Sequence, residues 1–327
     1  MLDERNVAAE NAARVRELID GLGTFRHWEA LRELDELRPD WRESLASKEA
    51  ADRWLTALRD ERGRNRAEAF RALGAMGDSR AVGPAMATLR RPGGMPVDEL
   101  EESVRVLGAT RHVAGVEVLL EWLTCDDYRV QGAVVEALGR LHDRRATPAL
   151  IELLPDADGY LQVQIVEALG ALGDAHATEA LVQALDSGSH LVRPAALRAL
   201  RQLGWRPESP SLEALATIAE RRWEALLSLG QVAVEPLLRA IRCELSDDDR
   251  PQEMLGVLEA LVERFGSGLG ADGLYSCASL QDLKVTTTET EYDEKDSPIG
   301  LSIRTSVLNC ARVRDLAQRE MERRAGR

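Results

Sequence analysis

An internal repeat constrains the fold of this chain more than any other feature of its sequence. Four segments can be aligned without internal gaps: EAFRALGAMGDSRAVGPAMATL, ESVRVLGATRHVAGVEVLLEWL, GAVVEALGRLHDRRATPALIELL and QIVEALGALGDAHATEALVQAL. The glycines at the same point of each, Gly74, Gly108, Gly139 and Gly170, follow one another at intervals of 34, 31 and 31 residues. Such a period is typical of arrays in which each repeat buries its apolar face against its neighbours.

Apolar residues on both sides of the repeated glycine have helical spacing. Val134 and Val135 lie four and three residues before Leu138, which puts the three on one face of a helix. The same spacing resumes after Gly139, in residues 149–154. Each repeat is therefore predicted to contain two helices joined by a short turn.

Turn-forming residues mark the ends of both predicted helices. Because glycine adopts a positive φ without strain, we expect the repeated glycine to end the first helix as a left-handed C-cap. An aspartate, Asp78, Asp143 or Asp174, follows four residues later, where its carboxylate can accept hydrogen bonds at the start of the second helix.

The composition agrees with helices and excludes several classes of protein. Aromatic residues make up 4% of the chain and hydrophobic residues 44%, which favours close-packed helices over a β-sandwich. The formal net charge of -14 disfavours a nucleic-acid-binding surface. No stretch reaches the ~18 apolar residues that a membrane span needs, and the acidic N-terminus lacks the pattern of a secretion signal. We therefore expect a cytoplasmic protein.

No pattern in the sequence indicates a catalytic, metal or cofactor site. The histidines form no HExxH motif, and residues 268–273 match GxGxxG without the βαβ unit that a dinucleotide site requires. Four cysteines lie far apart with no CxxC pair, which favours reduced apolar fillers over a zinc site or a disulfide framework: Cys125, Cys243, Cys277 and Cys310. We expect no cofactor, no metal and no catalytic residue.

The two ends of the chain differ from the repeats. We expect residues 1–60 to form capping helices, 61–265 the repeat array and 266–327 a C-terminal cap or arm. In this last part LKVTTTETEY and IGLSIRTSVL are β-prone and are separated by the turn-like DEKDSP, which predicts a small hairpin. The run CARVRDLAQREMERR predicts a terminal helix with Asn309 as its cap.

Three tryptophans, Trp28, Trp41 and Trp54, are spaced 13 residues apart near the N-terminus. Thirteen residues correspond to about 3.6 helical turns, so the three would not share one face of a helix. Because the first repeat of an array must cover an otherwise open end, we interpret them as core or capping residues rather than as an aromatic binding surface.

One repeat motif resembles a known repeat family. The pattern A-L-G-x-L-G-D-x-x-A-x-x-A-L, present from Ala168 to Leu181, is similar to the bacterial HEAT-like repeats that are also found in phycobilin lyases, and the resemblance covers roughly residues 60–245. It implies an all-α fold, a right-handed α-α superhelical solenoid, here with a small C-terminal β-hairpin and a terminal helix. Deoxyhypusine hydroxylase is an enzyme with such repeats, but the His-Glu pairs of its di-iron site are missing from this sequence.

The binding surface is predicted from the way helical hairpins stack. The second helices commonly line the concave surface, which is the default binding surface of a solenoid. Its candidate partner-binding residues are Arg80, Glu117, Trp122, Arg145, Glu152, His176, Glu179 and Gln183. A tryptophan with arginines nearby favours a protein or peptide partner.

The functional prediction is a non-enzymatic scaffold or adaptor of a bacterial cell, which binds a protein partner on the concave surface. Two alternatives stay open. One is a lyase or chaperone-like factor that acts on a chromophore-carrying protein. The other is a HEAT-like DNA-binding protein, against which the net charge of -14 argues.

Overall fold

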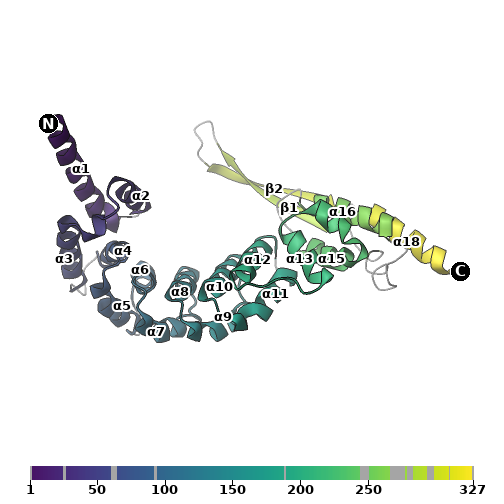
Figure 1. The fold of residues 1–327 in the computed structure, drawn as a ribbon, viewed down its shortest axis with the longest axis horizontal. Coiled ribbons are helices and arrows are strands. Elements are labelled where there is room, and N and C mark those ends of the chain that lie inside the picture. The colour runs from purple at the N-terminus through teal and green to yellow at the C-terminus, as the bar shows by residue number, and fades with distance from the viewer. Residues whose placement is uncertain are drawn as a thin grey trace. The chain divides into compact units, whose positions relative to one another are not determined.

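The computed structural model of the 327-residue chain describes residues 2–24, 27–59, 65–91, 94–187, 189–243, 250–265, 277, 283–292, 298–308 and 310–325. Within these residues the chain is helical apart from one pair of strands (Figure 1). It divides into two compact units. Unit 1 is Met1–Ala157 with Glu167–Asp174, and unit 2 is Asp158–Val166 with Ala175–Arg327.

Unit 1 begins with three helices and continues with helical hairpins. The first three are α1 (Leu2–Asp20), α2 (His27–Leu37) and α3 (Leu45–Arg59), with 3-10 turns at Gly21–Gly23 and Trp41–Glu43. The hairpins pair α4 (Arg66–Met76) with α5 (Val82–Leu89), α6 (Val97–Ala109) with α7 (Val116–Glu121), and α8 (Tyr128–Leu141) with α9 (Thr147–Leu153). A 3-10 turn precedes each second helix, at Ser79–Ala81, Val113–Gly115 and Arg144–Ala146. These pairs confirm the predicted helix, turn and helix of each repeat.

Unit 2 continues the helical pattern and contains the strands. The helix α10 (Gly159–Leu172) contributes to both units. It is followed by the 3-10 turn Ala175–Ala177, α11 (Thr178–Ser187), α12 (Val192–Gln202), α13 (Pro210–Ala219), α14 (Trp223–Ser228), the 3-10 turn Gly230–Ala233, α15 (Val234–Cys243) and α16 (Arg250–Phe265). The strands β1 (Leu283–Tyr292) and β2 (Pro298–Leu308) pair antiparallel, with Leu283 opposite Leu308 and an irregularity at Glu291/Tyr292. The last helix is α18 (Ala311–Ala325).

The repeated glycine does not cap the first helix, so that prediction is wrong. Gly74 and Gly139 lie inside α4 and α8. The left-handed residue comes three positions later, at Gly77 with φ 69° and at His142 with φ 52°. At Gly77 the backbone N–H donates to the carbonyl of Gly74, which closes the last turn of α4.

The repeated glycine instead permits close packing of neighbouring first helices. A Cβ atom built on Gly108 would lie 2.8 Å from the Cα of Ala137, and one on Gly139 would lie 3.0 Å from the Cα of Ala168. Real Cβ atoms essentially never lie closer than 3.0 Å to another atom, and 3.0 Å is tighter than nine in ten of their contacts, whereas at Gly74 the nearest atom would lie at 3.4 Å. Only a residue without a side chain lets the helix backbones approach to this distance.

The aspartate caps are confirmed at two repeats. Asp78 accepts a hydrogen bond from the backbone N–H of Arg80 at 3.0 Å, and Asp143 accepts one from Arg145 at 3.0 Å. Each carboxylate thus caps the 3-10 turn that leads into the second helix.

The tryptophan interpretation is right for Trp41 and wrong for Trp28. Trp41 is fully buried, and its indole N–H donates to Asp35 at 2.8 Å. Trp54 is half-buried and packs on Gly23, where an added Cβ would lie 2.9 Å from its ring. Trp28 is 61% exposed, so it neither caps nor fills the core.

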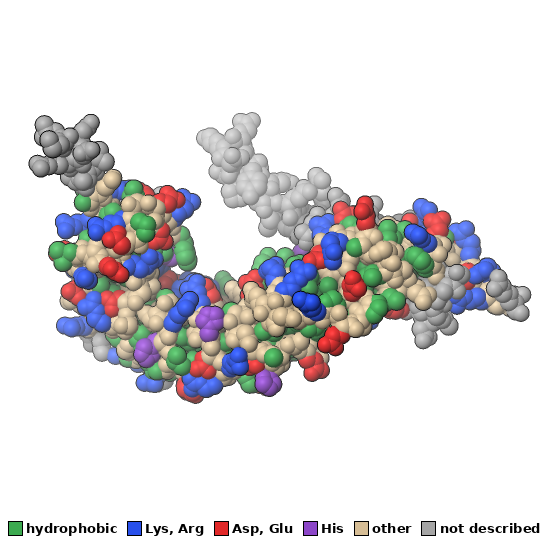
Figure 2. Space-filling model, in the orientation of Figure 1, with side chains coloured by type: hydrophobic (Ala, Val, Ile, Leu, Met, Phe, Trp, Pro, Cys, Tyr) green, Lys and Arg blue, Asp and Glu red, His purple; other side chains and the backbone are tan. Residues whose placement is uncertain are grey.

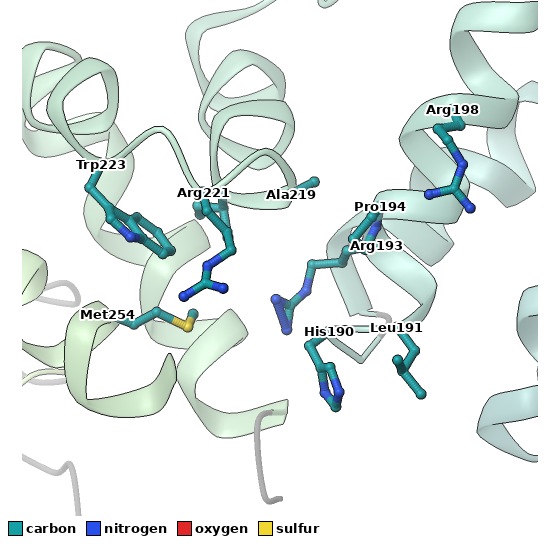
Figure 3. A pocket seen from close by; sticks show the side chains of 10 residues that line it. His190, Leu191, Arg193, Pro194, Arg198, Ala219, Arg221, Trp223 and Met254 are labelled. Carbon is teal, nitrogen blue, oxygen red and sulfur yellow. The ribbon is translucent and has the colours of Figure 1, made fainter. Parts of the chain in front are cut away.

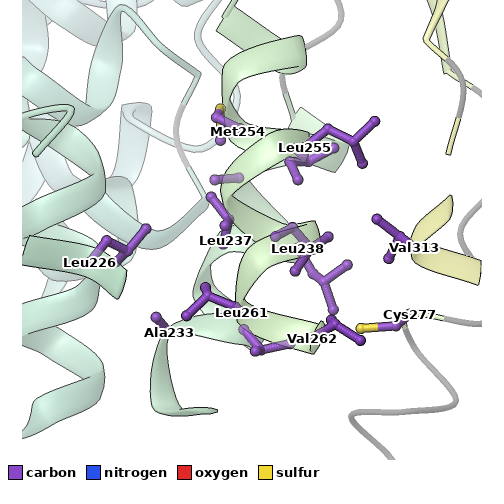
Figure 4. Close-up of a cluster of buried hydrophobic side chains, with 14 of the residues drawn as sticks. Leu226, Ala233, Leu237, Leu238, Met254, Leu255, Leu261, Val262, Cys277 and Val313 are labelled. Atoms are coloured by element: carbon purple, nitrogen blue, oxygen red, sulfur yellow. The ribbon is translucent and has the colours of Figure 1, made fainter. Parts of the chain in front are cut away.

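A separate apolar cluster holds unit 2 together (Figure 4). It joins α15 and α16 to the terminal helix α18, whose Val313 and Ala317 are buried. Cys277 and Cys310 are fully buried in this cluster, as expected of apolar fillers. Three other predictions fall on positions outside the described residues: the Asn309 cap, the 268–273 motif and the Cys243 side chain.

Candidate functional site

Three of the eight predicted partner-binding residues take part in ion pairs between neighbouring repeats. Arg80 pairs with Asp78 at 2.6 Å and also with Asp52 of the preceding helix α3 at 2.7 Å. Arg145 pairs with Asp143 at 2.7 Å and also with Glu117. These guanidinium groups keep the pKa of Asp78 and Asp143 below the ordinary value of 3.8. Each arginine therefore links its own cap to the repeat before it.

Trp122 also has a structural contact. Its indole N–H donates to the backbone carbonyl of Leu89 at 3.1 Å, which ties the end of α7 to the end of α5. The side chain is half-buried. The remaining four predicted residues are exposed, on α9, on the turn before α11 and on α11: Glu152, His176, Glu179 and Gln183. Whether a partner contacts any of the eight stays a prediction.

The first helices of unit 1, rather than the second ones, line a groove of about 130 Å³ together with α2. We call it the first-helix groove. Its apolar part comes from Leu31, Phe70, Gly74, Ala75 and Ala109, and its polar and aromatic part from His27, Trp28, Arg71, Glu102, Arg105 and Arg140. None of the eight predicted residues is among them.

The charges of the groove form a series of pairs across α4, α6 and α8. Arg71 donates to Glu102 at 2.8 Å, and Arg105 donates to Glu101 at 2.8 Å. Arg105 also contacts Glu136 at 3.5 Å, and Glu136 accepts from Arg140 at 2.6 Å. Burial raises the pKa of Glu102 above its ordinary value, and the charge of Arg71 acts in the opposite direction. These ion pairs thus hold the arginines of the groove in fixed positions.

An aromatic pair of α2 also lines the groove. The rings of His27 and Trp28 have centroids 4.4 Å apart. Burial, followed by the charge of Arg71, lowers the pKa of His27 below its ordinary value of 6.5. Because this favours the neutral imidazole at neutral pH, the pair presents a largely apolar surface beside the arginines.

Comparison with known proteins identifies the repeat. The family model of HEAT repeats matches residues 96–159 and 147–230. Residues 96–230 are HEAT repeats. The matched HEAT repeats include α6 and α8 of the first-helix groove, whereas α2 and α4 precede them.

Solved structures are also similar to this chain. The complex of CpcE and CpcF of phycocyanin lyase from Nostoc sp. PCC7120 is 25% identical, with a TM-score of 0.42 over 64% of this chain and 94% of that one. Two engineered proteins are 19% and 21% identical, with TM-scores of 0.43 and 0.31. The first alignment covers 80% of both chains, and the second covers 76% of this chain and 96% of the other. No curated protein sequence matches the chain.

Among the described helices, none combines the length and the apolar character needed to cross a membrane. In the described ranges, no three His, Cys, Asp or Glu side chains are grouped so as to hold a metal ion. On the face shown in Figure 2, basic and acidic side chains are interspersed.

Proposed function

We propose that this HEAT-repeat chain is a protein-binding scaffold whose first-helix groove holds a peptide segment of its partner. The observation that carries the proposal is the 61% exposure of Trp28 at the edge of this groove. An aromatic side chain buries about 150–250 Å² of surface when it is enclosed. An exposed tryptophan beside a groove can therefore contribute a large part of the binding energy. Tryptophan and arginine are also the residues most enriched at binding hot spots.

The size of the groove favours one anchoring side chain over a whole small molecule. Its volume of about 130 Å³ is below the ~300–1,000 Å³ of typical small-molecule pockets. One apolar side chain of a peptide can occupy such a space between Trp28 and the apolar residues of α4 and α6. The rest of the peptide would then lie along the surface of the first helices.

The arginines define the chemistry of the peptide next to that anchor. Three arginines and one glutamate line the groove. The side chain of Arg140 is 49% exposed, and a guanidinium carries several N–H donors beyond the one that Glu136 accepts. A carboxylate is the group that best matches such donors. The peptide is therefore expected to carry an acidic residue close to its apolar anchor.

The test is retention of a partner by variants of the tagged full chain in its native lysate, with bound proteins identified by mass spectrometry. Wild type and Tyr128→Ala are expected to retain the same protein, because Tyr128 is 77% exposed but lies outside the groove. Trp28→Ala is expected to lose at least about nine-tenths of it, since loss of a hot-spot residue weakens binding tenfold or more. Equal retention by Trp28→Ala would refute the groove as the binding site.

A third variant distinguishes this surface from the one predicted on the second helices. Glu152 is exposed on α9 and belongs to that predicted set. If Glu152→Lys loses the partner while Trp28→Ala keeps it, the second helices are the binding surface. The right-handed superhelical stacking, the division at residues 60 and 265 and the cytoplasmic location stay predictions.

A further inference from the structure

Unit 2 contains a second cavity, of about 360 Å³ (Figure 3). It shares no lining residue with the first-helix groove. It is lined by residues of α12, α13, α14 and α16, of the turn before α12, and of the turn between α13 and α14 that holds Arg221. Its volume lies within the ~300–1,000 Å³ range of small-molecule sites. The cavity can therefore hold a whole small ligand rather than one side chain.

The cavity is lined by cations and by apolar groups. Arg193, Arg198, Arg221 and His190 are among its described lining residues, none of which is acidic. In Figure 3 the side chains of Arg193 and Arg221 point toward one another across the cavity. Glu253 accepts a hydrogen bond from Arg221, but each guanidinium has several N–H donors, so both arginines can also donate to an anion that enters the cavity.

Both converging arginines are fixed by contacts within unit 2. Arg193 is 3% exposed, and its guanidinium donates to the backbone carbonyl of Ala240 at 3.3 Å. Arg221 donates to Glu253 at 2.6 Å, and the indole N–H of Trp223 donates to the same carboxylate oxygen at 3.2 Å. Their positions are thus set before any ligand arrives, which lowers the entropy lost on binding.

The position of Arg193 contradicts what a helix prefers locally. It is the second residue of α12, and the positive end of the helix dipole disfavours a cation there. Natural proteins break such rules mainly at functional sites.

The walls of the cavity define the rest of the ligand. Trp223 and Met254 line one side, and Leu191 and Pro194 contribute further apolar surface. Arginine pairs recognise phosphate by parallel N–H···O bonds, and an aromatic body can pack against an indole ring. We propose that this cavity binds an aryl phosphate, with the phosphate between Arg193 and Arg221 and the ring against Trp223.

Two ligands share this chemistry, a free aryl phosphate and a phosphotyrosine side chain of a partner protein. Isothermal titration of the full chain with phenyl phosphate, inorganic phosphate and a short phosphotyrosine peptide compares them. Phenyl phosphate is expected to bind about tenfold more tightly than inorganic phosphate, because only the former packs on Trp223. A further tenfold gain for the peptide would assign the site to a phosphorylated partner, and no gain would assign it to a free ligand.

Variants separate this site from a general attraction of phosphate to arginines. Arg221→Gln is expected to weaken phenyl phosphate about tenfold or more, since it removes a charge-assisted hydrogen bond. Arg201→Gln is the matched control: Arg201 also pairs with a glutamate, Glu220, but does not line the cavity. Trp223→Leu should weaken phenyl phosphate and leave inorganic phosphate unchanged. The proposal is overturned if phenyl phosphate shows no binding at millimolar concentration, or if both arginine variants weaken it equally.

Discussion

Substitution of Gly108 by alanine tests the close packing of the first helices. An added methyl group would lie 2.8 Å from the Cα of Ala137 and 3.0 Å from its Cβ. Two carbon atoms in contact prefer ~3.5–4.0 Å, so the methyl group would overlap its neighbour. The contacted atoms belong to backbone and to a Cβ, which no change of rotamer can move. The helices α6 and α8 must therefore separate to accept alanine.

Two opposing effects decide the size of the change. Overpacking of a well-packed interior raises the free energy of the folded state by about 1–3 kcal/mol. Alanine in place of glycine within a helix stabilises it by about 0.5–1 kcal/mol. Because the clash with α8 is the larger effect, Gly108→Ala is expected to lower the free energy of unfolding by about 1–2 kcal/mol.

Gly256→Ala supplies the control for this prediction. Gly256 also lies inside a helix, α16, but an added Cβ would meet nothing within 4 Å. This variant should therefore gain the helix propensity alone, about 0.5–1 kcal/mol. Urea titrations followed by far-UV circular dichroism would show the midpoint lowered by Gly108→Ala and raised by Gly256→Ala. A midpoint raised by both variants would show that α6 and α8 do not approach each other as described.

Two further predictions concern the repeats. Leu138→Ala, at a fully buried position of α8, should lower the free energy of unfolding by ~2–5 kcal/mol in the same titration, and a change below ~0.5 kcal/mol would contradict the packing of α8. Asp143→Ala should destabilise at pH 7 by about 1 kcal/mol through loss of its cap. The pKa of Asp143 is lowered from 3.8, so its contribution is complete above pH ~4 and is lost as pH falls through the lowered value. The stability difference between wild type and Asp143→Ala should therefore be constant from pH 5 to 8 and shrink in more acidic solution, whereas a constant difference at all pH values would rule out the charged cap.

The repeats could be predicted from the sequence because their signals are local. The spacing of Val134, Val135 and Leu138 marks one face of α8, and all three are buried. Asp78 and Asp143 cap residues only two positions away, so the aspartate itself reveals the cap. Such contacts depend on neighbouring residues and not on how the helices pack.

Local signals could not show which glycine caps the first helix and which one permits the close approach of a neighbouring helix. The left-handed position after the first helix holds Gly77 in one repeat but Arg111 and His142 in others, with φ of 51° and 52°. The cap is therefore not constant in the sequence, although it is constant in the structure. The constant glycine, by contrast, depends on the approach of a helix one repeat away, as at Gly108.

The candidate sites could not be predicted from the sequence, because they too depend on how separate helices pack. The three tryptophans lie on α2, in a 3-10 turn and on α3, and their spacing in the sequence does not reveal that Trp28 is the exposed one. The grouping of Arg193 with Arg221 and Trp223 depends on the packing of α12 against later helices, which no spacing in the sequence reveals.

One signal for the polar side chains was nevertheless present in the sequence. Arg71 pairs with Glu102 and Arg105 with Glu136, in both cases across 31 residues, which is the repeat period. Across 28 residues, Asp52 pairs with Arg80 and Glu117 with Arg145. A comparison of charges 28 and 31 residues apart would have assigned these residues to contacts between repeats.

This regularity gives a criterion for choosing functional residues in such a chain. A charged residue with an opposite charge about one period away takes part in a contact between repeats, so reversing its charge would replace an attraction by a repulsion there and alter stability together with any binding. Trp28 precedes the periodic region, and its exposed ring contributes no such pair. Its removal should therefore change binding with little change in stability. That separation makes Trp28→Ala a cleaner test of the scaffold function than a variant at Arg105 or Arg145.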